Sequence, residues 1–423
     1  MSHKLRSLVI IGAIFGYSLG YTPLYFFHLA ALTWAFISCI ALAAGKSIQI
    51  HQFRLLFPIL VFFLYATFSV LWVHNLDVWL RYQFYLLCGL FALFATYQSS
   101  EDAQQLRRTF TLIGTLISLN LLAGLAESTT PFRLPMSPYS PYAGHFGIVI
   151  DNLVIDNAST PTGFNGNPNN FGFIAVLSLP FFIFSKFHTV KLVGFSLVTW
   201  LLIAIGSKGH FLAFILLLLC TPLFHKRRTR MFSLAIILAA FTIAFLFLLM
   251  TNEIGHNLSR ILSSADEIMR GINLMQTGDD SANDSTGVRA NLYSYALSIF
   301  LASPLIGVGF GGIESLLIER NFTIQSLHFF FLQILVDLGL LGFSLFFIPY
   351  VILILKLRSI SNTSTDRFIS YISKSLSLSL IVAVPASIAP SGIHYMLSFY
   401  VLVGLSLLTL KVEAQRITAS DYR

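Results

Sequence analysis

A succession of long apolar runs is the feature that most constrains what this chain can fold into. A helix needs about 20 apolar residues to cross a membrane. We therefore predict an all-α, polytopic membrane helix bundle. The two runs around Lys208 form either two spans or one re-entrant hairpin. The runs suggest about twelve spans, near residues 7–21, 24–44, 55–73, 80–97, 109–126, 171–185, 191–206, 210–224, 231–250, 328–353, 373–390 and 393–411.

The composition fits a membrane protein. Only 10% of the 423 residues are charged and 56% are hydrophobic, whereas soluble proteins average about 25% charged residues. The three cysteines lie inside apolar runs, which indicates neither a disulfide framework nor a zinc site. No motif for a metal occurs between the spans, and we expect no metal, no cofactor and no nucleic-acid partner despite the net charge of +8.

The positive charges are divided unequally between the two sides of the predicted membrane. Lys and Arg are enriched in cytoplasmic loops, so the side with most of them is cytoplasmic and both termini lie there. Seven cations remain on the outer side: Arg81, Arg133, Lys208, Arg260, Arg270, Arg289 and Arg320.

Two outer segments are too long to be simple turns. The first, Glu127–Asn170, ends in the turn-forming run P-T-G-F-N-G-N-P-N-N-F-G before a span. The second, Thr251–Leu327, includes a mobile stretch, T-G-D-D-S-A-N-D-S-T-G, and then a segment that begins at Arg289. Helical spacing of its apolar residues predicts an amphipathic surface helix with one apolar face, formed by Leu292, Tyr295, Ala296, Ile299 and Phe300.

Three outer cations are candidates for binding an anion. Lys208 lies between two apolar runs, where a cation is usually satisfied by an anion or a water-filled cavity. Arg289 opens the surface helix, and its guanidinium can grip a phosphate with two hydrogen bonds. Arg81 opens the fourth span near the same surface. The structural alternative for these cations is anchoring to lipid headgroups.

His328 directly precedes the apolar run F-F-F-L-Q-I-L-V-D-L-G, where an imidazole can exchange a proton near neutral pH. A packed structural histidine is the alternative. The run G-V-G-F-G-G predicts a turn whose backbone approaches a neighbour closely, rather than a phosphate loop. Asp337, a carboxyl group inside a span, is expected to find a polar partner. The amides of N-G-N-P-N-N, in particular Asn167 and Asn169, are candidates for binding sugar hydroxyls or for capping the next helix.

Taken in order, these motifs resemble the bacterial O-antigen polymerase/ligase family. The resemblance rests on F-N-G-N-P-N-N-F-G, on S-K-G, on Arg289 before S-P-L-I-G-V-G-F-G, and on L-H-F-F-F-L-Q-I-L-V-D-L-G-L-L-G. The family often has Arg where Lys208 stands. It often has a small polar residue where Phe329 stands, especially in ligases, so the polymerase assignment is favoured.

The resemblance implies a glycosyltransferase of hexosyltransferase type with a GT-C-like architecture in the bacterial inner membrane, its active site facing the periplasm. The implied donor is an undecaprenyl-diphosphate-linked oligosaccharide. A polymerase passes the glycan to another lipid-linked repeat unit, by an inverting mechanism without metal, and a ligase passes it to lipid A–core. Membrane lipids and a chain-length regulator are further expected partners. His328 and Arg289 would be catalytic, and Lys208, Arg289 and Arg81 would bind the diphosphate.

On this basis the chain divides into N-terminal spans (1–126), a first periplasmic loop (127–170), central spans (171–250), a large periplasmic loop with the surface helix (251–327) and C-terminal spans (328–423). A lipid or sugar transporter is the alternative of a different class. Transporters usually place polar groups near mid-membrane and show internal repeats, whereas the polar candidates here lie at the outer rim.

Overall fold

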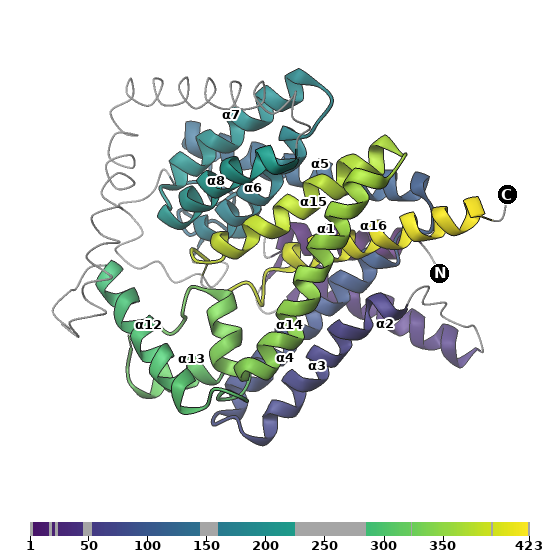
Figure 1. The fold of residues 1–423 in the computed structure, drawn as a ribbon. Helices are drawn as coiled ribbons and strands as arrows, with labels where there is room; N and C mark the ends of the chain where they lie inside the picture. The colour runs from purple at the N-terminus through teal and green to yellow at the C-terminus, as the bar shows by residue number, and fades with distance from the viewer. Residues whose placement is uncertain are drawn as a thin grey trace.

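The structure is a computed structural model that describes residues 3–16, 19–21, 24–44, 53–143, 160–224, 285–322, 324–390 and 392–421. These residues form a helical bundle, in which α14 packs against α15, α3 and α16 (Figure 1). The helices are α1 (His3–Phe15), α2 (Phe26–Ala43), α3 (Phe57–Phe68), α4 (Leu76–Tyr97), α5 (Ala103–Thr129), α6 (Pro168–Ile183), α7 (His188–Ile205), α8 (Lys208–Cys220), α12 (Ser285–Ala302), α13 (Gly312–Glu319), α14 (Phe330–Thr363), α15 (Arg367–Ala386) and α16 (Leu397–Asp421).

Strand structure in the described part of the chain is confined to one antiparallel pair, β1 (Gly20–Tyr21) with β2 (Leu24–Tyr25). Short 3-10 turns lie at Phe53–Leu55, Ser69–Leu71, Gly163–Asn165 and Thr221–Phe224. The prediction of an all-α membrane bundle is therefore confirmed.

Six helices in the described ranges are long and apolar enough to cross a membrane: α4, α5, α7, α14, α15 and the Leu397–Thr418 part of α16. They coincide with six of the predicted runs. The runs at 24–44, 55–73, 171–185 and 210–224 form shorter apolar helices, and the run at 7–21 forms the 13-residue α1. The predicted run 231–250 lies outside the described residues. The structure thus supports six long spans rather than all twelve.

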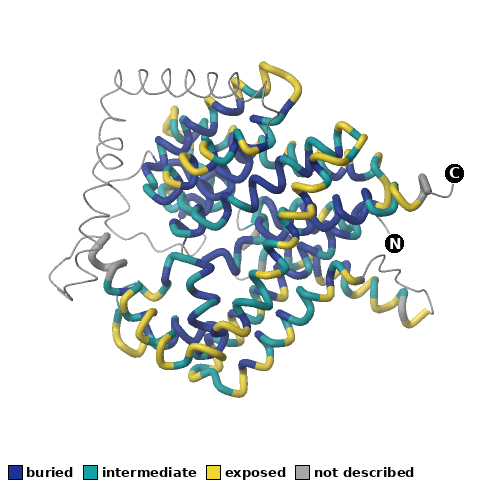
Figure 2. Tube along the Cα trace, viewed as in Figure 1, coloured by how far each residue is buried: buried dark blue, intermediate teal, exposed yellow. Residues whose placement is uncertain are grey.

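The interior of the bundle is buried along its length (Figure 2). α15 packs on α14 on one side and on α6 and α8 on the other, while α16 packs on α4. Two buried serines of α15 face α6, where small side chains let helix backbones come together. Ser379 Oγ donates to Leu177 O at 2.7 Å and Ser375 Oγ to Pro180 O at 3.5 Å, whereas Ser377 Oγ donates to Ile354 O of α14 at 3.2 Å.

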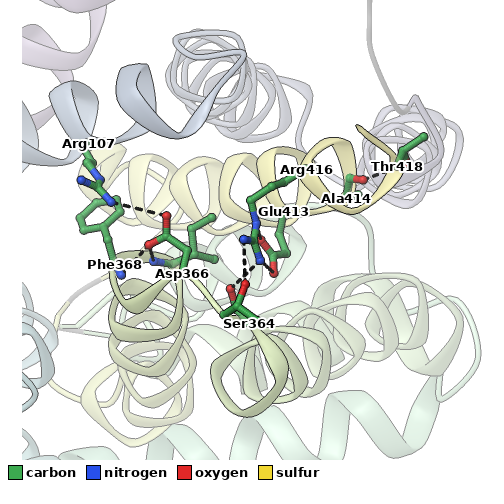
Figure 3. A network of polar contacts seen from close by, with 10 residues as sticks. Arg107, Ser364, Asp366, Phe368, Glu413, Ala414, Arg416 and Thr418 are labelled. Atoms are coloured by element: carbon green, nitrogen blue, oxygen red, sulfur yellow. Dashed lines mark hydrogen bonds and ion pairs between the residues drawn. The ribbon is translucent and has the colours of Figure 1, made fainter. Parts of the chain in front are cut away.

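One end of the bundle carries an ordered polar network, and we call it the Arg107 end (Figure 3). Arg107 pairs with Asp366 at 3.4 Å and lies over the ring of Phe368. Arg416 pairs with Glu413 at 2.7 Å. Lys411 and Arg6 belong to this end too, since they donate to Tyr97 O and Gln98 O at the C-terminal end of α4. The opposite end, which carries His328, is called the His328 end.

α14 is broken at Gly339, whose backbone angles (φ 63°, ψ −171°) are not helical. The glycine-rich turn before α13 fills this break. Gly309 N donates to Asp337 O at 2.7 Å, and Leu340 N donates to Pro304 O at 2.8 Å. Backbone groups at membrane depth must be satisfied by protein, and here the turn satisfies them. The expected close approach of G-V-G-F-G-G to a neighbour is confirmed.

Asp337 joins the turn to the broken helix through its side chain. The carboxyl group is fully buried and accepts hydrogen bonds from Gly311 N at 3.0 Å and Ile313 N at 2.9 Å. Its expected polar partner is therefore the backbone at the start of α13. The same interaction orients α13 against α14 and α4.

The surface helix predicted after Arg289 corresponds to α12. Leu292 and Ala296 are buried against Ile313, Leu317 and Val336, and the other residues of the predicted face pack around them. The opposite face is not purely polar, since Leu297 and Leu301 are exposed there. The predicted apolar face is therefore confirmed.

Replacing Gly307 by alanine should destabilise the fold. Its φ is +69°, and a Cβ would lie 2.3 Å from Asp337 O. Strained backbone of this kind costs about 1–3 kcal/mol, and the clash adds to that cost. We expect a lower midpoint in thermal unfolding of the detergent-solubilised protein. Gly114→Ala on α5 is the matched control, because a Cβ there meets nothing within 4 Å. Equal midpoints for the two variants would contradict the docking of the turn into the break.

Candidate functional site

An open cavity of about 410 Å³ lies at the His328 end, and we call it the His328 cavity. Its wall comes from the first turns of α4, from α13, and from the segments that precede α14 and α16. It contains both imidazole and charged groups. The lining residues are Arg81, Tyr82, Tyr85, Glu314, Ile324, Gln325, Ser326, His328, His394 and Tyr395.

His328 occupies a strained backbone position in this wall. Its φ is +52°, a value that non-glycine residues rarely adopt, and such residues gather at functional sites. Nδ1 lies 3.4 Å from Ala389 O at the end of α15. A proton on Nδ1 would point at this carbonyl and leave Nε2 as the basic nitrogen. The prediction that His328 stands at the mouth of an apolar helix is confirmed, and its catalytic role stays a prediction.

His394 is a second imidazole in the same cavity. Its ring stacks on Tyr82 with centroids 4.3 Å apart, and it is buried. Burial, with a smaller contribution from Arg81, lowers the pKa of His394 to about 3. His394 is therefore neutral at physiological pH and offers a hydrogen bond rather than a charge.

Arg81 is held by a network that links three helices. Its guanidinium pairs with Glu314 of α13, whose other oxygen accepts from Tyr82 Oη at 2.6 Å. Gln333 of α14 donates to Tyr82 Oη, also at 2.6 Å. The network fixes the position of Arg81 in the wall and balances its charge with one carboxylate.

Lys208 and Arg289 are placed less directly. Lys208 begins α8, and the next residue, Gly209, packs on Ala389, the residue whose carbonyl faces His328. Lys208 thus lies near the turn that holds the imidazole, but it does not line the His328 cavity. Arg289 lies on α12, and its side chain falls outside what the structure describes. The structure brings Arg81 and His328 together and leaves the gathering of all three cations a prediction.

The N-G-N-P-N-N stretch has two roles. Asn167 caps α6, since its Oδ1 accepts from Asn169 N at 2.8 Å and Asn170 N at 3.3 Å. Two other amides, Asn165 and Asn170, line a second cavity of about 310 Å³. The capping alternative is thus confirmed for Asn167, and the amides that reach a cavity are neighbours of the predicted pair.

Glu127 holds this stretch in place. The buried carboxylate at the end of α5 accepts from Thr162 N at 2.7 Å, Gly163 N at 2.8 Å and Leu134 N at 3.2 Å. Both ends of the described part of the first outer loop are therefore tied to one side chain.

The other outer cations have structural partners where the structure describes them. Arg133 donates to the carbonyls of Thr130 and Phe132, and Arg320 lies over the ring of Tyr295 at 4.6 Å. Arg260 and Arg270 lie outside the described residues. The stretch expected to be mobile also lies outside them, except for its last three residues. Within the described ranges, no group of three or more His, Cys, Asp or Glu side chains is arranged to hold a metal ion.

Two apolar grooves approach the polar region from opposite sides. The first, between α3, α4, α14 and α16, extends from His394 to Arg54 and Lys356. The second, between α5, α6, α15 and α16, extends from Ser398 to Tyr371. Each groove therefore leads from the His328 end towards the Arg107 end.

Sequence reasoning missed His394, Glu314 and Tyr82 as members of these cavities, and within the N-G-N-P-N-N run it singled out Asn167 and Asn169 rather than Asn165 and Asn170. Glu314 and Arg81 are 233 residues apart in the chain, and no local pattern joins them. The sequence offers one signal for these residues, which is that they lie next to apolar runs. Polar residues do so at many positions, so this signal does not single out the cavity residues.

The burial of neutral His394 makes stability depend on pH. Because its folded-state pKa is depressed, the unfolded state binds the extra proton between pH 6.5 and about 3. The free energy of unfolding is therefore highest above pH 6.5. It decreases as the pH falls towards 3, by up to about 1.4 kcal/mol per pH unit. Thermal unfolding in detergent between pH 7 and 5 should show a smaller loss for His394→Gln than for the wild type. The control is His188→Gln, at an exposed side chain at the start of α7; parallel curves for all three proteins would contradict the assignment.

Comparison with known proteins bears on the region that contains His328. Residues 193–347 match the family model described as O-Antigen ligase, a segment that includes Lys208, Arg289 and His328. The whole chain is similar to the teichuronic acid biosynthesis protein TuaE of Bacillus subtilis (strain 168), with 22% identity over 426 residues, covering 95% of this chain and 81% of that protein. These two matches support the resemblance indicated by the motifs: over residues 193–347 the chain is similar to the O-antigen ligase model, and it resembles the O-antigen polymerase/ligase family.

Proposed function

We propose that this membrane protein is a polysaccharide polymerase that transfers an undecaprenyl-diphosphate-linked glycan to another lipid-linked repeat unit. The observation that carries the proposal is the strained His328 in an open cavity beside Arg81, within the segment that matches the O-antigen ligase model. The name of the similar TuaE supports a role in polysaccharide biosynthesis.

The orientation follows from charge. Cations gather at the Arg107 end, and cytoplasmic loops are enriched in Lys and Arg. The Arg107 end is then cytoplasmic and the His328 end periplasmic, in the bacterial inner membrane. The twelve-span count and a GT-C-like architecture belong to the same proposal, with residues 1–126, 171–250 and 328–423 as spans and 127–170 and 251–327 as periplasmic loops.

The chemistry at the anomeric carbon needs a base and cations. The acceptor hydroxyl forms the new bond to the anomeric carbon while its proton passes to His328. The bond to the diphosphate breaks, and its electron pair stays on the diphosphate oxygen. A single displacement of this kind inverts the anomeric centre and requires no metal.

The cations stabilise the charge that grows on the leaving diphosphate. We assign this role to Arg289 and Lys208. Arg81 contributes when the diphosphate displaces Glu314 from its guanidinium. Two amides were first predicted to bind the glycan, Asn167 and Asn169. Asn167 instead caps its helix. Asn169 stays in the proposal only because it is next to Asn170. The acceptor hydroxyl is expected within reach of His328.

The two apolar grooves favour a polymerase. Each leads to the polar region from a different side of α16 and suits one lipid tail. Donor and acceptor of a polymerase each carry one polyprenyl tail, whereas lipid A brings several acyl chains together. Transfer to lipid A–core is the second candidate, favoured by the description of the matched family model. A transporter is disfavoured, because the polar groups lie at one end of the bundle rather than at its middle.

His328→Ala should abolish polymer formation when the variant is expressed in a strain that lacks the native gene. Loss of a positioned base costs about a hundred- to ten-thousand-fold in rate. The measurement is glycan analysis by gel, with membrane insertion checked by immunoblot. His74→Ala, an exposed histidine near the same end, should retain normal chains. A normal chain-length ladder from His328→Ala would remove this residue from the mechanism.

The same strain separates the two candidate functions. A polymerase-deficient strain retains single capped repeats and lacks long chains, whereas a ligase-deficient strain accumulates unattached lipid-linked polymer. We expect the first pattern, and the second would establish the ligase.

Lys208→Ala and Arg289→Ala should each lower the rate of transfer by about a hundred- to a thousand-fold, as measured with purified protein and lipid-linked repeat unit. Lys208→Arg keeps the charge and should retain most activity. Lys186→Ala, an exposed cation of the Arg107 end, is the control. Full activity of Lys208→Ala would remove Lys208 from the diphosphate site.

A further inference from the structure

The cavity of about 310 Å³ lined by Asn165 and Asn170 has no role in the chemistry described above, and we call it the Asn170 cavity. We propose that it is a sugar-binding subsite, which holds one monosaccharide unit of a lipid-linked substrate next to the reacting centre, with Asn170 as its main hydrogen-bonding group. The inference rests on the proposed function and names the ligand class of a second part of that site.

The two cavities share a wall. Arg81, Tyr85 and Tyr395 line both the His328 cavity and the Asn170 cavity. The partition between the two cavities is therefore one side chain thick, and a ligand in the Asn170 cavity lies next to the His328 cavity. The volume lies at the small end of the range for ligand pockets, about 300–1,000 Å³, which suits one small polar ring rather than an extended chain.

Asn170 has a polar atom without a partner. The residue is 6% exposed, and its Oδ1 is buried and accepts no hydrogen bond from any described residue. Such groups are rare in proteins and call for a specific explanation. Asn170 belongs to the first turn of α6, and rotation of its side-chain amide would present the oxygen to a hydroxyl in the cavity. The backbone is fixed meanwhile, because Asn170 N donates to the capping Asn167.

Aromatic rings form one continuous part of the wall, and the remainder is mostly aliphatic or small side chains. Tyr25 lies 5.5 Å from His28, which lies 5.4 Å from Phe84, and Tyr85 lies 5.9 Å from Tyr395. Phe84 and Tyr85 complete the series with centroids 6.3 Å apart. Aromatic faces provide flat apolar area, while Tyr and His edges provide hydrogen-bonding groups.

This mixture fits a sugar better than a diphosphate or a lipid tail. A pyranose ring has apolar C–H faces and polar hydroxyl edges, which match rings and amides respectively. Among the described lining residues, Arg81 is the one permanent cation, and it is already paired with Glu314. A lipid tail would leave Asn170 Oδ1 without a donor, at a cost in binding.

The test is steady-state kinetics of the purified full-length protein in nanodiscs, with separately labelled lipid-linked donor and acceptor. Asn170→Ala should raise KM for one of the two substrates about tenfold, as expected for one lost hydrogen bond, and change kcat little. Tyr25→Leu, which alters this cavity and not the His328 cavity, should do the same and keeps the test open if Asn170→Ala fails to fold. A rise for the donor assigns the subsite to the donor glycan, and a rise for the acceptor assigns it to the acceptor.

Asn362→Ala, at the exposed end of α14, is the control and should behave as the wild type. Unchanged KM values for both substrates in the Asn170 and Tyr25 variants would overturn the inference, as would a rise in KM for Asn169→Ala but not for Asn170→Ala. Absence of any transfer by the wild type would instead contradict the proposed function. A fall in kcat alone would also overturn the subsite, because it would indicate an effect on chemistry rather than on sugar binding.

Discussion

The fold of the His328 end depends on how the break in α14 is filled. A helix interrupted at membrane depth exposes backbone groups that lipid cannot satisfy. The turn before α13 supplies the missing partners, and the Asp337 carboxyl group binds the first amides of α13. Three elements are thereby fixed together: the outer part of α14, the turn, and α13. Glu314, which holds Arg81, stands on the element that this arrangement positions.

The two ends of the bundle use their polar residues differently. At the Arg107 end, side chains pair with each other and with helix termini, as Arg107 does with Asp366. At the His328 end, polar groups surround cavities, and His328 and Asn170 adopt arrangements that packing alone does not require: one has a strained backbone, the other a buried oxygen without a donor. The first pattern stabilises the bundle, and the second supports the ligand-binding role that we propose for the His328 end.

Much of the helical layout could be predicted from hydropathy, because burial in a membrane leaves a strong local signal. The apolar face of α12 was predicted from helical periodicity, and the close approach of the turn was predicted from its run of glycines. The residues of the candidate site were harder to predict from the sequence. Asn167 and Asn170 belong to one short run, yet one caps a helix and the other lines a cavity, and their difference depends on where α5 and α6 meet. The pairing of Arg81 with Glu314 depends on tertiary structure alone.

The ion pair between Arg81 and Glu314 also sets which anions can enter. A lone guanidinium in an open cavity would attract any small anion from the surrounding solution. Here a carboxylate already occupies it, so an incoming group must outcompete an intramolecular partner that is held in place by Tyr82. Only a ligand that brings several oxygens, or further contacts elsewhere, gains enough to do so. A monatomic anion such as chloride brings neither, so it is disfavoured at this guanidinium in the resting protein.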